Sequence, residues 1–250
     1  MNGIVGIIFL DIERLWINRN RVLMSLVQPL LYLFVLGSGL SASAGAHFGS
    51  GGYQKYIYPG IVILTLLFNS SSAAIGIVVD RQVGFLKALL VAPVSRNAIA
   101  FGKILSGALQ AMVIAILLLL LAPFVGVTFT VASLVKFVLA MALSAVVFSA
   151  LGVGFAARLS AITSFPVFTN TILLPMFFLS GAIYPLDNVP AWLRALAYVD
   201  PVAYGVDLLR GSLSGHYVFP VPLSLLVLVG FLLAFAYSAV RVFDGRGGDD

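Results

Sequence analysis

The chain is apolar almost without a break from Ala98 to Ala157. A helix that crosses a bilayer needs ~20 apolar residues, so this stretch is too long for one crossing and fits two. We expect the turn between them at 122–130, where Pro123 and Gly126 interrupt the run. The apolar residues are continuous rather than alternating, which argues against a membrane β-barrel.

The whole composition agrees with a membrane protein. Hydrophobic residues make up 61% of the chain and charged residues 9%, whereas a soluble domain carries roughly 25% charged residues. The sequence therefore predicts an all-α polytopic membrane protein. Because the chain has no cysteine, it can form neither a disulfide nor a thiolate metal site.

The apolar runs define six predicted spans in one transmembrane domain, 1–250. Their approximate bounds are 22–40, 57–79, 99–121, 131–157, 162–181 and 218–240. Between the first two spans, a loop rich in Gly, Ser and Ala is expected to be flexible. Lys103 and Lys136 lie near span ends, where their side chains could reach the interface.

Residues 3–18 have the pattern of an amphipathic helix, with Asp11 and Arg14 on its polar face and isoleucines largely opposite. Such a helix would lie in the membrane interface. An ordinary helix packed on the end of the bundle fits the pattern equally well. Both interpretations remain open at this point.

Charge distribution predicts the orientation. Six spans place both termini on one side, and ten of the 14 Lys and Arg residues fall on that side. The positive-inside rule then puts both termini in the cytoplasm. The net charge of +5 reflects this asymmetry and gives no reason to expect a nucleic-acid partner.

Several kinds of chemistry are missing from the sequence. All nine acidic residues and both histidines are predicted outside the membrane cores, which argues against a proton relay, an intramembrane protease and a metal site. The chain has no G-x-x-x-x-G-K-[ST] motif, so it has no Walker A loop for ATP. We therefore expect a protein without catalytic or metal-binding residues, driven by another polypeptide.

A charged, patterned segment interrupts the apolar runs at 80–97. Val83, Leu86 and Leu90 follow the i, i+3, i+7 spacing of an amphipathic helix. A turn between antiparallel spans needs only a few residues, so the extra helix suggests a surface that another protein binds. The pattern alone fits a helix lying on lipid headgroups equally well.

The same segment carries a run of motif residues: Asp80, Arg81, Gly84, Leu86, Leu89, Leu90, Pro93, Ser95 and Arg96. This run resembles the cytoplasmic loop of the ABC-2-type family of transporter membrane subunits. In that family the loop forms a coupling helix that docks into the ATP-binding subunit. Gln82 and Lys87 stand where acidic residues are common in the family, so the salt-bridge partners would differ.

A second match to the family lies between Phe177 and Gly211. Its residues are Gly181, Pro185, Trp192, Asp200, Pro201, Asp207 and Arg210. In the family this block forms short external helices, here within 182–217, that re-enter the outer leaflet; two surface helices are the alternative. Asp200 as N-cap followed by Pro201 predicts the start of a helix. Gly211 predicts that this helix ends after Arg210. Asp207 and Arg210 are three residues apart and could form an ion pair.

Two spans carry polar faces at helical spacing. These are Thr65, Asn69 and Ser72 in the second span, and Thr163 and Asn170 in the fifth. Polar and small residues in lipid usually pack against other helices. In the resembling family the same spans line the substrate path at the subunit interface.

The resemblance implies a permease subunit of an ATP-driven exporter in the bacterial cytoplasmic (inner) membrane. Its cargo would be amphipathic: a drug, a lipid or a glycoconjugate. It implies a separate cytoplasmic ATP-binding subunit that holds ATP and Mg, and a second permease copy, identical or related. Apart from membrane lipid, no other partner or cofactor is expected. An energy-independent channel or scaffold, and a membrane enzyme, are the alternatives.

Overall fold

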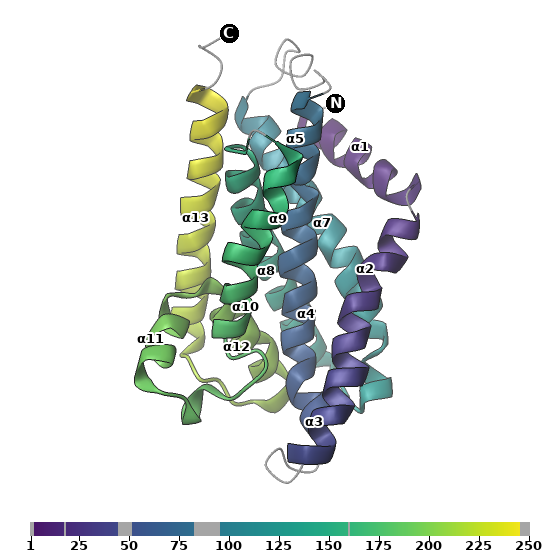
Figure 1. Ribbon diagram of the computed structural model, residues 1–250, viewed down its shortest axis with the longest axis vertical. Helices are drawn as coiled ribbons and strands as arrows, with labels where there is room; N and C mark the ends of the chain where they lie inside the picture. Colours follow the sequence, from purple (N-terminus) through teal and green to yellow (C-terminus); the bar gives the residue numbers. More distant parts are fainter. Residues whose placement is uncertain (1–2, 18, 45–51, 83–95, 160, 246–250) are drawn as a thin grey trace.

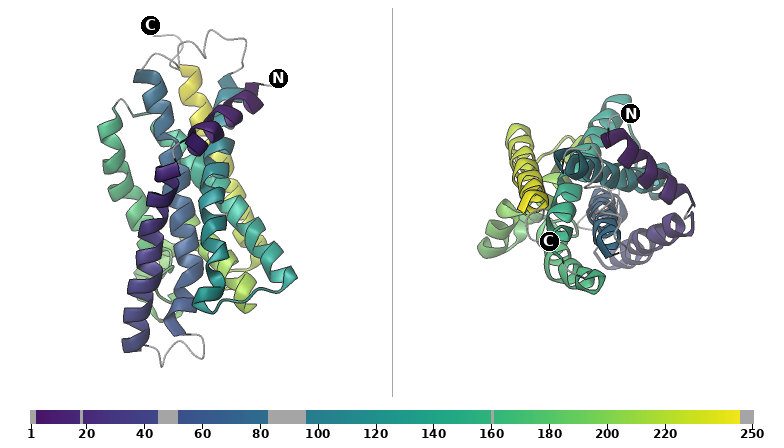
Figure 2. Two further views of the ribbon diagram at one scale, coloured as in Figure 1. Left: turned by 90° about the vertical axis from the view of Figure 1, so that its right-hand side faces the viewer. Right: turned by 90° about the horizontal axis from the view of Figure 1, so that it is seen from above.

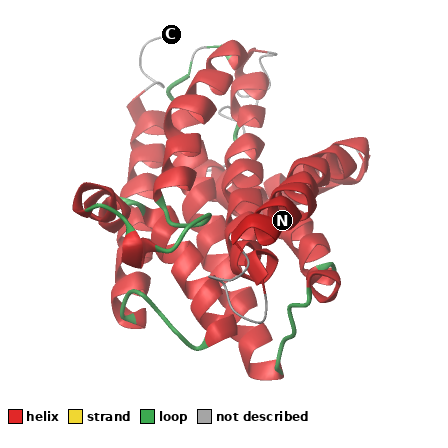
Figure 3. Ribbon diagram, turned by 60° about the horizontal axis from the view of Figure 1, so that its bottom comes forward, coloured by secondary structure: helices red, strands yellow, loops and turns green. Residues whose placement is uncertain are grey.

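The computed structural model describes residues 3–17, 19–44, 52–82, 96–159 and 161–245. Within these ranges the chain forms helices joined by short loops, and no strand occurs (Figure 3). The helices are α1 (Gly3–Ile17), α2 (Arg19–Leu31), η1 (Tyr32–Leu36), α3 (Gly37–Ala44), α4 (Gly52–Ala73), α5 (Ile75–Gln82), α7 (Arg96–Leu120), η4 (Ala122–Val125), α8 (Val131–Ala156), η5 (Ile162–Ser164), α9 (Phe165–Phe168), η6 (Thr169–Leu173), α10 (Leu174–Leu179), η7 (Leu186–Asn188), α11 (Ala191–Val199), α12 (Pro201–Ser214) and α13 (Val221–Gly245).

Six helical stretches are long and apolar enough to cross a membrane, which confirms the prediction of an all-α protein with six spans. They lie roughly parallel along the long axis of the bundle (Figures 1 and 2). α1 and the end of α13 lie at the same end, which we call the terminal end (Figure 1). The six stretches are Val22–Ser41, Gly52–Asp80, Asn97–Leu120, Val131–Ala156, Ile162–Leu179 and Val221–Arg241.

The core forms around α4, which packs against α7, α8 and α12. All residues of α4 from Ile57 to Leu67 are buried. Small residues allow the neighbours to approach closely: a Cβ added at Gly152 of α8 would lie 2.6 Å from the Cα of Ser71. The second span is therefore the central helix of the single chain.

α1 packs across α7 at the terminal end, with Ile7 buried against Gly102. The structure thus agrees with a helix packed on the end of the bundle. Within its polar face Asp11 is buried, whereas the Arg14 side chain is 54% exposed, and the apolar Phe9 and Leu10 are exposed as well. The helix therefore lacks the water-facing polar side and buried apolar side of an interfacial helix.

The turns follow local sequence signals in part. The predicted turn at 122–130 is present: η4 ends at Gly126 with φ of 73°, and Thr130 caps α8 together with Ser133. The loop expected between the first two spans is shorter than predicted, since α3 continues to Ala44 and α4 begins at Gly52. Glycine and serine in this stretch did not prevent helix formation, because the ends of α3 and α4 pack on each other.

The second and fifth spans are irregular. A turn at Ala74 separates α4 from α5, with the Ala74 N–H donating to the carbonyl of Ser71 (3.1 Å). The fifth span changes from 3₁₀ to α to π and back to α, and it carries Pro166 and Pro175. Prolines and π turns are common causes of bends in helices, so both spans contain points where a helix can change direction.

The start of α12 matches its prediction and its end does not. The N–H of Val202 donates to Asp200 Oδ1 (2.9 Å), and Pro201 occupies the first turn. The helix continues past Gly211 to Ser214 and ends at Gly215, whose φ is 75°. Gly211 is buried inside the helix against the ring of Tyr217, so packing and not chain termination explains this glycine.

Candidate functional site

Most of the predicted coupling segment lies outside the described residues. This holds for Gly84, Leu86, Leu89, Leu90, Pro93 and Ser95. Its two flanks are described: Asp80 and Arg81 belong to α5, and Arg96 begins α7. The docking surface itself stays a prediction, and the structure shows how its flanks are held.

A buried group of charges joins the two flanks to α1. Lys103 of α7 donates from Nζ to Asp80 Oδ2 of α5 (3.1 Å) and to both carboxylate oxygens of Asp11 (3.1 Å each). Ser106 Oγ donates to Asp11 Oδ2 (2.7 Å), and Arg14 donates to Asp80 Oδ1 (3.3 Å). We call these five residues the charge cluster.

The charge cluster is balanced and mostly sealed from solvent. Asp80 and Lys103 are 2% and 7% exposed, whereas the Arg14 side chain is 54% exposed. Buried charges require partners of opposite sign, because each ion loses its hydration on burial. Two carboxylates facing two cations meet this requirement. The cluster therefore fixes α1, α5 and α7 relative to one another at the terminal end.

This arrangement corrects one expectation, because the Lys103 side chain is buried against Asp11 and Asp80 instead of extending toward the membrane interface. The pairing could not be predicted from local spacing, because Lys103 is 92 residues from Asp11 and 23 from Asp80. The one available signal was that isolated charges of opposite sign fall at the same predicted end of three apolar helices.

A cavity of about 540 Å³ lies beside the cluster, and its wall includes Asp11, Asp80, Ser72 and Gln110. It brings Ser72, from the predicted polar face of the second span, next to the charges. The other two residues of that face bond within their own helix. Thr65 Oγ1 donates to the Ile61 carbonyl (2.8 Å), and Asn69 Nδ2 donates to the Thr65 carbonyl (2.9 Å).

The polar face of the fifth span lies on the outside of the single chain. Thr163 and Asn170 are exposed, whereas Thr65 is buried. The two polar faces therefore do not form one continuous surface within this chain. Whether Thr163 and Asn170 meet a second copy or line a path stays a prediction.

At the opposite end, Arg210 of α12 fixes the chain just after the fifth span. Its guanidinium donates to the carbonyls of Gly181 (3.2 Å) and Ala182 (3.1 Å) and lies 3.9 Å from the centre of the Tyr56 ring. Burial lowers the pKa of Arg210 from its ordinary value. Gly181 has a φ of 73°, a conformation that favours glycine.

Asp207 forms no ion pair within 4.0 Å with Arg210, the pair that the spacing suggested, although the two charges attract each other at longer range. Its two carboxylate oxygens accept the N–H groups of Val218 (2.8 Å) and Phe219 (3.1 Å). Burial raises the pKa of Asp207, and these two hydrogen bonds oppose the rise. Asp207 therefore fixes the chain that leads into α13, while Arg210 fixes the chain that leaves α10.

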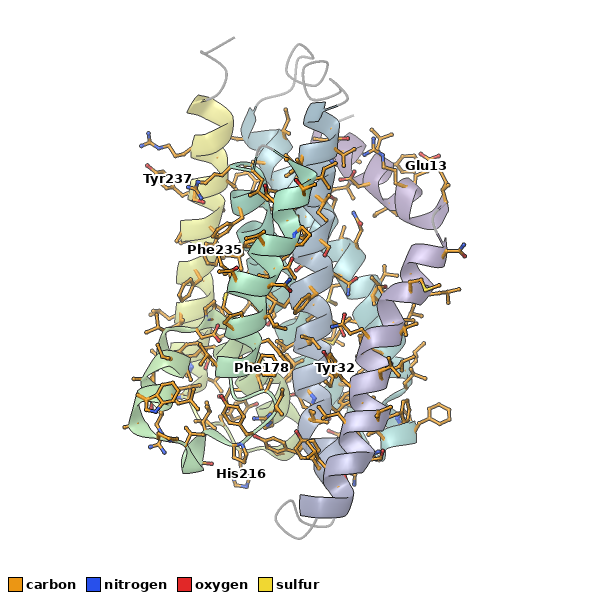
Figure 4. All side chains as sticks on the ribbon, viewed as in Figure 1. Glu13, Tyr32, Phe178, His216, Phe235 and Tyr237 are labelled. Atoms are coloured by element: carbon orange, nitrogen blue, oxygen red, sulfur yellow. The ribbon has the colours of Figure 1, made fainter. Side chains whose placement is uncertain are left out.

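A cavity of about 710 Å³ opens at this end, lined by Arg210, Pro185, Lys55 and His216 among others. Figure 4 places His216 at the end of the bundle farthest from the termini. Trp192 of α11 is exposed on the outer surface. Of the family-derived residues of this block, Pro185, Asp207 and Arg210 line this cavity, and Trp192 lies outside it.

The family model described as "ABC-2 type transporter" matches residues 7–214 of the chain. The chain belongs to the ABC-2 type transporter family. It is therefore the membrane permease subunit of an ABC transporter, from a family that lacks an ATPase domain. Such a permease works with a separate ATP-binding subunit.

Relatives of the permease support this assignment over most of its length. It is 28% identical to the inner membrane transport permease YadH of Escherichia coli K12, over 89% of this chain and 86% of YadH. It is 26% identical to nodulation protein J of Rhizobium leguminosarum bv. viciae, over 85% of this chain and 82% of that protein. It is 27% identical to nodulation protein J of Rhizobium leguminosarum bv. trifolii, over 87% of this chain and 85% of that protein.

Asp200 lies at the start of α12, which packs into the bundle against α4, α8 and α13. A Cβ added at Gly205 would lie 3.0 Å from Ser144 Oγ, midway along α8. Asp200 therefore begins a helix whose first turns lie deep between the spans of the permease.

No metal site accompanies these carboxylates in the part of the chain that the structure describes. Within those ranges, no group of three His, Asp or Glu side chains comes close enough to hold an ion. The acidic residues instead contact Lys103, backbone N–H groups or, for one oxygen of Asp200, nothing polar.

Proposed function

We propose that the permease exports an amphipathic substrate across the cytoplasmic membrane, driven by an ATP-binding subunit that docks on the segment 80–97. The observation that carries this proposal is the charge cluster. It joins both flanks of the segment to α1 through Lys103, Asp80 and Asp11. A push on the segment would therefore move three helices together, which a plain turn between spans could not do.

Charge and the position of the helix ends support the orientation that this proposal requires. α1 and the end of α13 lie at the terminal end (Figure 1), and ten of the 14 cationic residues were assigned to that side. The positive-inside rule supports a cytoplasmic terminal end. The segment 80–97 then faces the cytoplasm, where an ATP-binding subunit would hold ATP and Mg.

The second span would carry the motion across the membrane. α5 follows α4 after the turn at Ala74, and α4 packs against α7, α8 and α12. A displacement at Asp80 would therefore reach α12 and the cavity around Arg210 at the opposite end. In this mechanism α11 and α12 form the external re-entrant segment that closes the exit.

A second permease copy would complete the path, and we favour a homodimer. The exposed polar residues Thr163 and Asn170 support an interface or path on the fifth span, because polar groups are unfavourable against lipid. Thr65, Asn69 and Ser72 would serve the second span in the same way. The cargo would be amphipathic: a drug, a lipid or a glycoconjugate.

The test is co-purification with the candidate ATP-binding subunit. A variant carrying Leu86→Glu, Leu89→Glu and Leu90→Glu should lose the subunit, because charges on the apolar face oppose docking. Thr128→Glu is the control, since Thr128 is exposed in the loop at the opposite end of the bundle. It should retain the subunit.

Equal retention by the triple variant and the wild type would contradict docking on this segment. Substrate flux in vesicles that contain the permease without the ATP-binding subunit would favour an energy-independent channel instead.

A further inference from the structure

The cavity of about 710 Å³ at the end of the bundle opposite the termini has two cationic residues in its lining. It lies between the start of α4, the turn before α8 and the connection from α12 to α13, where Figure 4 places His216. The cations are Lys55 of α4 and Arg210 of α12. The rest of the lining combines polar residues, such as Thr128, with apolar ones, such as Leu213.

Lys55 presents an ammonium group at this cavity. Its side chain is exposed and lies along the turn before α8, because a Cβ added at Gly126 would be 3.0 Å from Lys55 Cε and 3.8 Å from Nζ. Among the described residues, no carboxylate comes within 4.0 Å of this ammonium. A lysine ammonium carries three donors, so Lys55 can bind an anion directly.

Arg210 adds a second positive charge to the wall. Its guanidinium donates to the backbone carbonyls of Gly181 and Ala182 and lies over the Tyr56 ring, and none of these groups carries a full negative charge. Its Nε is buried without a hydrogen-bond partner in the part of the chain that the structure describes. Coulomb attraction acts over several ångströms, so this charge would favour an anion in the cavity without touching it.

Two carboxylates in the lining determine how strongly an anion could bind. Asp207 is already engaged, since its two oxygens accept the N–H groups of Val218 (2.8 Å) and Phe219 (3.1 Å). Asp187 is exposed at the cavity, and its charge would repel an anion. Removing the Asp187 charge should therefore strengthen anion binding, whereas removing the Lys55 charge should weaken it.

We propose that this cavity binds a phosphate group, with Lys55 as the direct contact and Arg210 as a second charge at longer range. Lysine is a common phosphate ligand in proteins. The volume of about 710 Å³ lies within the range of ligand pockets and leaves room for an apolar part attached to the phosphate. The phosphate could belong to a lipid headgroup or be a free ion. The site goes beyond the transport function, since binding requires neither ATP nor the ATP-binding subunit.

The experiment is isothermal titration calorimetry of the full-length permease in dodecyl maltoside, with protein-free micelles as the blank. Dihexanoylphosphatidylglycerol and inorganic phosphate are titrated separately. Lys55→Met removes the charge and keeps an unbranched side chain. We expect it to weaken binding at least fivefold, which corresponds to about 1 kcal/mol. Lys55→Arg keeps the charge and should retain most of the binding.

Two further variants separate a site from general surface charge and from poor folding. Lys136→Met makes the same change at an exposed lysine of α8 outside the cavity lining, and it should bind like the wild type. Asp187→Asn should tighten binding at least twofold, a gain that a poorly folded variant would not show.

The two probes distinguish the sources of the phosphate. Binding of the lipid alone, with loss on Lys55→Met, would support a headgroup site, and the same loss with inorganic phosphate would support a site for the free ion. Equal binding of both probes by the wild type and Lys55→Met would overturn the proposal. So would an equal loss in Lys136→Met, weaker binding by Asp187→Asn, or no binding of either probe above the blank.

Discussion

Replacing Lys103 by methionine should destabilise the permease more than any other single change in the charge cluster. The substitution keeps an unbranched apolar side chain but removes the ammonium that Asp11 and Asp80 share at 3.1 Å. The exposed Arg14 would be the remaining cation of the cluster. Two carboxylates at a separation of roughly 6 Å repel by about 3 kcal/mol at an effective dielectric constant of ~20.

An independent estimate gives a similar size. Removing one partner of a buried ion pair costs about 3–5 kcal/mol, because the remaining charge stays buried without compensation. We therefore expect Lys103→Met to lower the free energy of unfolding by about 3 kcal/mol. The measurement is unfolding of the purified permease by SDS in mixed micelles, followed by circular dichroism.

Arg14→Met is the matched control. The Arg14 side chain is 54% exposed and meets Asp80 at 3.3 Å, and an ion pair with such an exposed partner contributes about 1 kcal/mol or less. Salt should weaken the Arg14 contact and leave the Lys103 contact almost unchanged. A triple change, Asp11→Asn with Asp80→Asn and Lys103→Met, should recover part of the loss, because no buried charge remains. The reasoning is refuted if Lys103→Met is as mild as Arg14→Met.

Three other predictions test separate parts of the structure. Gly181→Ala should lower the free energy of unfolding more than Gly215→Ala. Both glycines have positive φ (73° and 75°), but a Cβ at Gly181 would lie 2.6 Å from the Leu186 side chain, whereas a Cβ at Gly215 would meet nothing within 4 Å. The difference between the two variants in SDS unfolding therefore measures the cost of the clash with Leu186. The stability of the wild type should fall as pH rises from about 4 to about 8, because burial raises the pKa of the folded Asp200 carboxyl from 3.8 to about 8 and the folded state therefore binds this proton more tightly than the unfolded state. Asp200→Asn should remove this part of the pH dependence of the melting temperature. An unchanged slope of melting temperature against pH would contradict the prediction. Asn170→Leu should alter transport in reconstituted vesicles and leave assembly with the ATP-binding subunit intact, whereas loss of assembly would indicate a packing role.

The features that the sequence predicted well are those decided by local residues. A run of about 20 apolar residues forms a spanning helix wherever it lies, so six spans could be counted. Asp200 and Pro201 begin a helix because the cap and the first turn involve adjacent residues. The turn at 122–130 likewise depends on Pro123 and Gly126 within a few residues of each other.

The features that the sequence missed depend on residues that are distant along the chain. Asp207 lies three residues before Arg210, the spacing that suggested a pair, yet backbone N–H groups 11 and 12 residues later bind it instead. Gly211 has the residue type of a helix stop, but it lies inside α12 against the ring of Tyr217. In each case tertiary packing offered a partner that competes with the local one.

The two ends of the permease are held by different kinds of bond, and this difference bears on how motion would cross it. At the terminal end, charge pairs join side chains of α1, α5 and α7. At the opposite end, Arg210 and Asp207 bind backbone groups of the chain on either side of α12. Each end thus forms its own connected unit, and the second span belongs to both.

The turn at Ala74 lies between these two units on the second span. α4 before it packs against α12, whereas Asp80 in α5 after it belongs to the charge cluster. If an ATP-binding subunit moves the segment 80–97, the terminal unit would shift as one body, and the second span would bend where its helix is already broken. Restoring a continuous helix there should therefore reduce transport without releasing the ATP-binding subunit, whereas breaking the charge cluster should affect both.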